Sequence, residues 1–292
     1  MQAERGGGAM YSAGKVTFHE KAYFLGNGQY EQEGFEQWNQ PGGAIVSVGI
    51  MEFMKKATFK DNFALHGGNG GGIANGGTLT FNRKAIFRNN TAEVSFTDDG
   101  ENYDGHGAGL YNLGGSATVL FKRLAIFKDN KGGYRGCALG ANGGTEENGD
   151  IGEGLNSIVF EDKAEFMDNY CYRNETGGAA LWVYGESTVE FQDTAVFKRN
   201  IARNGGAIMN AGTLKFASQD ALVMADNVAK ESCPDIKNYD KNLDDHLYDE
   251  FGDINDPNYE CSPNTPCTWY LGEVQIGSDS YTGESADICE LA

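Results

Sequence analysis

One sequence motif recurs along most of this 292-residue chain and limits what the chain can fold into. The motif is Phe-x3-Ala-x-Phe-x2-Asn, and its first copy runs from Phe18 to Asn27. It returns with unchanged spacing from Phe53, Phe81, Phe121, Phe160 and Phe191. A seventh copy, from Phe216 to Asn227, has Met224 in place of the second Phe and two additional residues. A motif repeated in this way predicts stacked units of one kind.

Each repeat reads as a set of short strands. Apolar and polar residues alternate around both Phe positions, as in 79–81 and 85–87, and a period of two is typical of strands. A third strand is expected at a Gly-Gly-Ala-Ile segment farther upstream. Such segments lie at 42–45, 71–74, 107–110, 177–180 and 205–208. The unit of about 23 to 28 residues is too short for a propeller blade.

We therefore predict an all-β fold, a right-handed parallel β-helix over residues 6–229 with seven to eight coils of three short strands. Coils of such a solenoid stack about 4.8 Å apart, so each side chain lies above its counterpart. The motif phenylalanines then form two aromatic columns inside the tube, and the alanines lie where the tube is narrow. The asparagines are expected to form a ladder of side-chain amides or to cap the turn backbone. They are Asn27, Asn62, Asn90, Asn130, Asn169, Asn200 and Asn227.

The spacing between repeats varies, and the extra residues indicate where a ligand would bind. The motif asparagines are 27 to 40 residues apart, and the surplus is expected between each Asn and the next glycine pair. Inserts on one edge of a solenoid commonly form its functional face. The candidate binding residues from these inserts are Tyr30, Trp38, Asp98, Asp99, Glu101, Tyr103, Asp104, His106, Tyr134 and Arg135. Their rings could pack on sugar faces, and their carboxylates could accept hydrogen bonds from sugar hydroxyl groups.

Carboxylates in the inserts could also hold calcium, the one cofactor that the sequence suggests. Calcium prefers oxygen ligands, which clustered Asp and Glu supply, although their spacing differs from that of an EF-hand loop. The candidate ligands are Asp98, Asp99, Asp104, Glu146, Glu147 and Asp150.

Six cysteines suggest disulfides and an oxidising compartment. They are Cys137, Cys171, Cys233, Cys261, Cys267 and Cys289. We expect Cys137 to pair with Cys171, and the other four to pair among themselves in an order that the sequence leaves open.

Residues 230–292 form a distinct acidic extension that contains those four cysteines. One or two strands within 267–276 are expected to fold back over the last coil, since an open coil would expose a sheet edge. The first coil has no such cover in the sequence. A neighbouring subunit or a further segment is expected to stack on it.

The charge of the chain bears on its partners. Its formal net charge is −19, of which −12 falls in residues 230–292. This balance argues against nucleic acid and anionic membrane, which are polyanions, and suits calcium or cationic partners. No apolar run reaches the roughly 18 to 20 residues of a membrane helix, so membrane insertion is not expected.

The paired signatures Gly-Gly-Ala-Ile and Phe-x2-Asn resemble the polymorphic outer-membrane protein repeat, best known from chlamydial autotransporter adhesins. The resemblance covers roughly residues 6–229. It implies a secreted or cell-surface β-helical passenger that binds host or neighbouring surfaces.

Two classes of function fit these observations. The first is a non-catalytic secreted or cell-surface protein for adhesion, ligand binding or scaffolding, whose partner is a protein or glycan surface. The second is a calcium-dependent polysaccharide lyase or epimerase, which needs carboxylates and a base on one exposed sheet face. Outward strand positions such as Glu52, Thr80 and Glu190 place no carboxylates on adjacent coils, so the first class is favoured and no catalytic residue is predicted.

Overall fold

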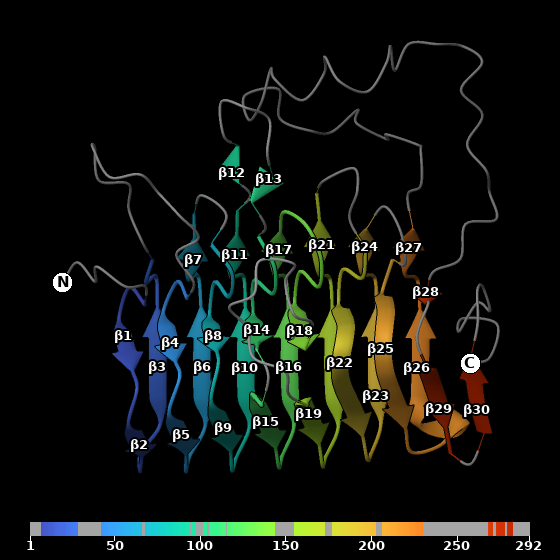
Figure 1. Cartoon of the computed structure of the whole chain (residues 1–292), viewed down its shortest axis with the longest axis horizontal. Helices are drawn as coiled ribbons and strands as arrows, with labels where there is room; N and C mark the ends of the chain where they lie inside the picture. Colours follow the sequence, from blue (N-terminus) through green and yellow to red (C-terminus); the bar gives the residue numbers. More distant parts are fainter. Residues whose placement is uncertain are drawn as a thin grey trace.

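The computed structural model is a solenoid of parallel sheets whose axis runs from the N-terminal coil to the C-terminal coil (Figure 1). The predicted all-β parallel β-helix is confirmed, because each strand pairs in parallel with its counterparts in neighbouring coils. The structure describes residues 7–28, 42–65, 68–93, 95–96, 102–103, 105–114, 116–143, 155–172, 177–202, 206–229, 268–270, 273–277 and 279–282.

The largest sheet, sheet A, has 15 strands, most of them in two rows. Its first row is β1 (Met10–Ser12), β4 (Ile45–Ser47), β8 (Ile73–Asn75), β14 (Leu110–Leu113) and β18 (Leu139–Gly143). Its second row is β2 (Lys15–Phe18), β5 (Ile50–Phe53), β9 (Thr78–Phe81), β15 (Thr118–Phe121) and β19 (Asn156–Phe160). Two long strands, β22 (Leu181–Phe191) and β25 (Ile208–Phe216), run through both rows and join them.

Two further sheets complete the coils. Sheet B consists of β3 (Ala22–Leu25), β6 (Ala57–Lys60), β10 (Ala85–Arg88), β16 (Ala125–Lys128), β20 (Ala164–Met167), β23 (Ala195–Lys198) and β26 (Leu222–Ala225). Sheet C consists of two-residue strands directly after the motif Asn: β7 (Phe63–Ala64), β11 (Thr91–Ala92), β17 (Lys131–Gly132), β21 (Tyr170–Cys171), β24 (Ile201–Ala202) and β27 (Val228–Ala229). The coils therefore carry one more short strand than the three predicted.

Two columns of phenylalanine fill the tube, as predicted. In the column from Phe18 to Phe216, neighbouring ring centroids are 4.7 to 5.2 Å apart and the rings are nearly parallel. The column from Phe24 to Phe197 stacks in the same way, and the two columns meet edge to face. Met224 continues the second column in the last coil, since it pairs with Phe197. The two additional residues of that repeat are taken up at the 3-10 helix η1 (Gln219–Ala221).

The motif asparagines form the predicted ladder, and they also cap the backbone. Oδ1 of Asn130 accepts bonds from the backbone N and the Nδ2 of Asn90, at 3.1 and 3.0 Å. Nδ2 of Asn130 donates to Oδ1 of Asn169 and to the carbonyl of Phe87. The pattern extends from Asn27 to Asn227. The two expected roles, ladder and cap, are thus filled by the same atoms.

A second, shorter amide ladder was not predicted. Nδ2 of Asn75 donates to Oδ1 of Asn112 at 2.7 Å, and Nδ2 of Asn112 donates to Oδ1 of Asn156 at 2.6 Å. These three side chains are buried where the two rows of sheet A meet. They satisfy the polar backbone of that bend.

The glycine segments are offset from their expected positions in two coils, and one coil was missed. The residue at the turn before each first-row strand has positive φ, for example 78° at Gly42 and 72° at Gly70. By this criterion the segments begin at Gly70 and Gly178, one residue away from the predicted 71 and 177. The missed coil begins at Gly136, whose φ is 56°, and leads into β18.

This missed coil corrects the prediction that all inserts follow the motif Asn. Residues 131–143, taken as part of an insert, run through β17 and β18 as an ordinary coil. The surplus residues of that repeat are 144–154, between β18 and β19. Inserts therefore leave the solenoid at two corners, one after sheet C and one between the rows of sheet A.

The two ends of the solenoid differ. Strands β28 (Thr268–Tyr270) and β29 (Glu273–Ile276) pair with β25, so the tail covers the C-terminal edge of sheet A as predicted. Strand β30 (Asp279–Thr282) then pairs with β29 in antiparallel fashion. At the other end, β1, β2 and β3 pair on one side only among the described strands.

Candidate functional site

Three of the predicted binding residues lie together, and most of the others lie outside the described residues. His106, Tyr134 and Arg135 meet on the outer face of sheet A. Only the backbone of Tyr103 is described, in the short hairpin of β12 (Ser95–Phe96) and β13 (Asn102–Tyr103). The remaining predicted binding and calcium residues fall outside the described ranges: Tyr30, Trp38, Asp98, Asp99, Glu101, Asp104, Glu146, Glu147 and Asp150.

The ring of His106 is held between two aromatic rings. It stacks on Trp182 with centroids 4.5 Å apart and on Tyr111 with centroids 5.4 Å apart. Strand register explains the sandwich, because Tyr111, Gly140 and Trp182 occupy equivalent positions on β14, β18 and β22. Gly140 has no side chain to place between the two rings. A Cβ at this position would lie 2.8 Å from Cδ2 of Tyr111.

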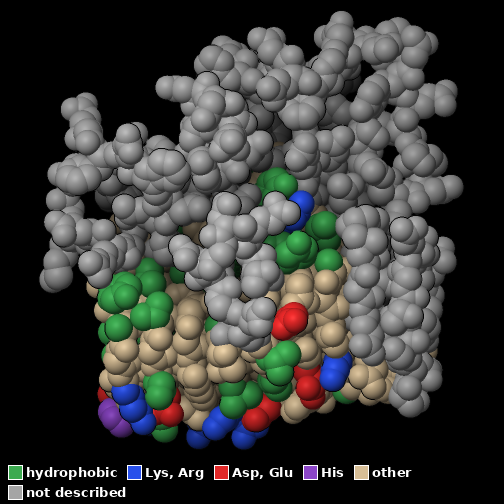
Figure 2. All heavy atoms as spheres, viewed as in Figure 1, with side chains coloured by type: hydrophobic (Ala, Val, Ile, Leu, Met, Phe, Trp, Pro, Cys, Tyr) green, Lys and Arg blue, Asp and Glu red, His purple; other side chains and the backbone are tan. Residues whose placement is uncertain are grey.

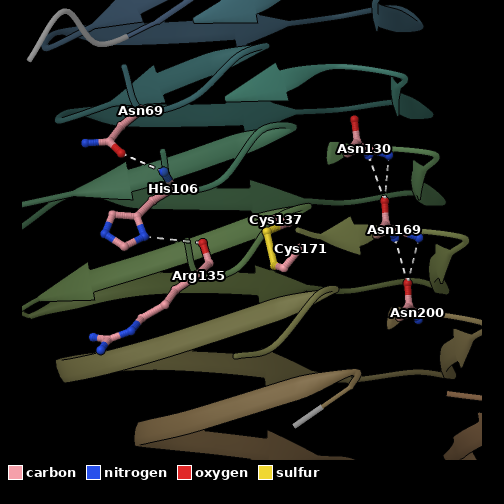
Figure 3. Close-up of a disulfide and its surroundings, with 8 residues drawn as sticks. All are labelled: Asn69, His106, Asn130, Arg135, Cys137, Asn169, Cys171 and Asn200. Carbon is pink, nitrogen blue, oxygen red and sulfur yellow. Dashed lines mark hydrogen bonds between the residues drawn. A yellow bond between two sulfur atoms is a disulfide. The ribbon is translucent and has the colours of Figure 1, made fainter. Parts of the chain in front are cut away.

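Hydrogen bonds fix the position of His106 (Figure 3). Its backbone N donates to Oδ1 of Asn69 at 2.7 Å. Its ring Nδ1 lies 3.3 Å from the carbonyl oxygen of Arg135, so Nδ1 carries the proton in this contact. With 4% of its surface exposed, His106 packs between the two rings and contacts the backbone of Arg135.

Arg135 is the unusual member of the cluster. Its guanidinium lies 4.6 Å from the ring centroid of Tyr134 and 5.7 Å from that of Trp182, and Nη2 donates to the Tyr134 hydroxyl at 3.2 Å. No carboxylate of the described chain lies within ion-pair distance of it. Its Nε and the indole Nε1 of Trp182 are buried, and neither has a hydrogen-bond partner among the residues that the structure describes. The cluster thus contains two buried donors and a cation that no described carboxylate balances.

Tyr184 gives the cluster an exposed edge. It stacks on Trp182 with centroids 5.4 Å apart, and 43% of its surface is exposed, against 2% for Trp182. In Figure 2 hydrophobic side chains and a basic one gather over the upper part of β18 and β22. We call Tyr134, Arg135, Trp182 and Tyr184 the aromatic–arginine cluster.

A disulfide joins the two neighbouring coils that carry Arg135 and Trp182. Cys137 and Cys171 form the predicted bond, with Cα atoms 5.5 Å apart (Figure 3). They pack with Ala179 and Ala202 in a small core of their own. Gly132 lies beside the bond, where a Cβ would be 2.6 Å from the Cys137 sulfur. The other four cysteines lie outside the described residues, so their pairing stays a prediction.

Elsewhere on the solenoid, basic and acidic side chains of different coils form ion pairs. Arg199 donates to the Asp168 carboxylate from Nε and Nη2, at 2.6 and 2.9 Å. These bonds, with the positive charge of Arg199 and of Lys128, hold the pKa of Asp168 below its ordinary value of 3.8. Asp168 precedes a ladder Asn and has a φ of 57°, a left-handed conformation that Asp and Asn tolerate better than most residues.

Neither a metal centre nor a membrane helix is found in the described part of the chain. No group of three or more His, Cys, Asp or Glu side chains there could hold a metal ion. No helix in the same ranges is long and apolar enough to cross a bilayer.

Comparisons place the chain in no known group. No family model, curated protein or solved structure matches it. The resemblance to the polymorphic outer-membrane protein repeat therefore stays an expectation.

Three members of the site were not predicted, namely Tyr111, Trp182 and Tyr184. A signal was available, because the residue after each first-row Ile or Leu points outward, and this position holds Tyr111, Gly140, Trp182 and Met209. This signal was not recognised, because the residue types at outward positions follow no rule of packing.

Proposed function

We propose that this protein is a non-catalytic, secreted or cell-surface β-helix that binds a ligand through the aromatic–arginine cluster. The observation that carries the proposal is Arg135, which lies against two rings with no described carboxylate partner in a chain of net charge −19. The Cys137–Cys171 disulfide suits an oxidising compartment. The resemblance to the adhesin repeat is consistent with this role.

The chemistry of the cluster favours a carbohydrate that carries a carboxylate. A guanidinium binds a carboxylate through two parallel hydrogen bonds, and a buried donor without an acceptor costs about 1 to 3 kcal/mol until a ligand supplies one. The exposed ring of Tyr184 offers a flat surface on which a sugar ring could pack. An acidic sugar satisfies both features at once.

Titration of the protein with acidic oligosaccharides, followed by tryptophan fluorescence and calorimetry, tests this proposal. Uronate- and sialate-bearing oligosaccharides should bind, whereas neutral analogues that lack the carboxylate should not. Arg135→Gln should weaken binding at least about tenfold, because it removes the bidentate partner. Lys215→Gln, a surface substitution on β25 with the same change of charge, should bind as the wild type does.

Two results would count against the proposal: equal binding of acidic and neutral sugars, or unchanged binding by Arg135→Gln. For the lyase or epimerase alternative, the predicted carboxylates lie outside the described residues, and no described contact favours it. Release of unsaturated products from polyuronates would nevertheless establish it.

A further inference from the structure

Six basic side chains line one edge of the N-terminal half of the solenoid. They lie in the turns that join the second row of sheet A to sheet B, after β5, β9 and β15. We call this set the basic edge: Lys55, Lys56, Arg83, Lys84, Lys122 and Arg123. Figure 2 shows Lys and Arg side chains along the lower edge of the molecule, below β9 and β15.

The cations of the basic edge are largely unpaired. Arg123 lies 3.8 Å from Asp162 in the next coil. The other five form no ion pair with any residue that the structure describes. The three turns themselves contain no acidic residue.

Strand register stacks these like charges above one another. Phe53 pairs with Phe81 and Ala57 pairs with Ala85, so the turn with Lys55 lies beside the turn with Arg83. Neighbouring coils are about 4.8 Å apart, a distance at which like charges repel. At the next corner of the same coils, cations are paired with carboxylates instead, as Arg88 is with Asp129 at 3.2 Å. The fold itself therefore gives no reason for stacking these like charges. An anionic partner would reduce the repulsion between them.

The equivalent turns of the C-terminal coils are acidic in balance. They contain Glu161, Asp162, Asp193 and Asp220, with Lys163 as their one basic residue. Charge is therefore separated along the solenoid axis, and several coils at about 4.8 Å each exceed the Debye length of about 8 Å. The net charge of −19 therefore does not prevent the basic edge from binding an anion.

We propose that the basic edge binds a linear polyanionic polysaccharide laid along the solenoid axis. Two cations per coil at a regular spacing match the regular charges of such a polymer. Thr58, Ile86 and Ile126 face outward from the adjoining strands of sheet B and are partly exposed, which offers a surface for sugar rings. A thin chain can follow this strip alone, whereas a nucleic acid duplex is broader and would approach the acidic coils.

Binding of the full chain to an immobilised heparin-type sulfated polysaccharide and to polygalacturonate tests the proposal at physiological ionic strength. Neutralising four cations, Lys55→Gln, Lys56→Gln, Arg83→Gln and Lys84→Gln, should weaken binding about tenfold or more and reduce its salt dependence. The matched control neutralises four cations elsewhere, Lys15→Gln, Lys131→Gln, Lys198→Gln and Lys215→Gln, and should keep the wild-type affinity. The stronger of the two polymers identifies sulfate or carboxylate as the preferred group.

Equal losses in the two variants would overturn the proposal, because binding would then follow net charge. Tighter binding to an oligonucleotide or to phosphatidylserine vesicles than to either polysaccharide would overturn the choice of partner. If the fourfold variant fails to fold by circular dichroism, the pairs Lys55→Gln with Lys56→Gln and Arg83→Gln with Lys84→Gln give the same comparison. Arg135 is unchanged in all these variants, so failure here leaves the proposed function standing.

Discussion

Asn130 shows how much one side chain contributes at the scale of the residue. It is fully buried, and its amide group serves three neighbours: Asn90, Asn169 and the carbonyl of Phe87. A buried polar group of this kind is stabilising only while every bond is made. A substitution at the ladder position therefore leaves several buried groups without partners at once.

Asn130→Ala should lower the free energy of unfolding by about 3 to 5 kcal/mol, because it leaves buried groups of Asn90 and Phe87 without partners. Chemical denaturation monitored by circular dichroism measures the change. The control is Asn89→Gly, one residue earlier, where φ is 51° and the side chain is exposed. That variant should differ from the wild type by less than about 1 kcal/mol, and a similarly small loss for Asn130→Ala would refute a structural role for the ladder.

The Asp168–Arg199 pair should make stability depend on pH in acid. The folded-state pKa of Asp168 is lowered by Arg199, so the unfolded chain binds the proton more tightly. The pair's contribution is therefore present above pH 3.8 and is lost as the pH falls below that value. Melting temperatures of the wild type and Asp168→Asn should differ near neutral pH and converge in acid. A constant difference across this range would contradict the assignment.

Some residues of the fold could be predicted from the sequence and others could not. The Phe and Asn columns could be predicted, because each position has the same packing requirement in every coil and the same residue type therefore repeats in the sequence. The corner before each Asn was not predicted, because its requirement is a backbone angle that Asp61, Asn89 and Arg199 all adopt. The site residue Trp182 was missed for a related reason, since outward positions follow no rule of packing.

At the scale of the element, the coil that begins at Gly136 explains the main error. Its Gly-Cys-Ala-Leu segment departs from Gly-Gly-Ala-Ile because Cys137 replaces the second glycine. The position requires a small side chain, and the disulfide to Cys171 occupies the space. The residues 144–154 then separate the two strands of sheet A that normally follow each other closely. Because of these two changes, the sequence of this coil does not show the repeat motif.

Replacing both Cys137 and Cys171 by Ala should reduce the free energy of unfolding by about 3 to 4 kcal/mol, on the loop-closure estimate for two cysteines 34 residues apart. Denaturant titration under non-reducing conditions provides the measurement. Retention of β-sheet circular dichroism would show that the variant still folds. A change below about 1 kcal/mol would mean that the bond adds little to the stacking of these coils.

At the scale of the whole molecule, the two ends of the solenoid present different surfaces. The tail strands β28 and β29 continue sheet A beyond the last coil. At the first coil, β1, β2 and β3 have described partners on one side, and Tyr23 and Leu25 on β3 are exposed. An exposed sheet edge can pair with another chain. That a neighbouring subunit or a further segment stacks on the N-terminal coil stays a prediction, and the subunit can be tested directly.

Leu25→Lys should reduce self-association, because charged side chains on an edge strand oppose pairing with another strand. Leu25 is 57% exposed. The matched control is Leu155→Lys, which adds the same charge away from that edge at a residue that is 74% exposed. Sedimentation velocity over a range of protein concentrations compares the variants. A wild-type chain that stays monomeric, or equal effects of both substitutions, would reject stacking through this edge.

The constant register of the aromatic positions has an evolutionary consequence. Phe53 pairs with Phe81, Phe81 with Phe121 and Phe121 with Phe160, and Phe191 still pairs with Phe216 after the register shift between β22 and β25. A coil duplicated within the gene would continue both aromatic columns and the amide ladder without adjustment elsewhere. The solenoid can therefore lengthen or shorten by whole coils, and each new copy would bring a fresh pair of corners on which sequence is free to diverge.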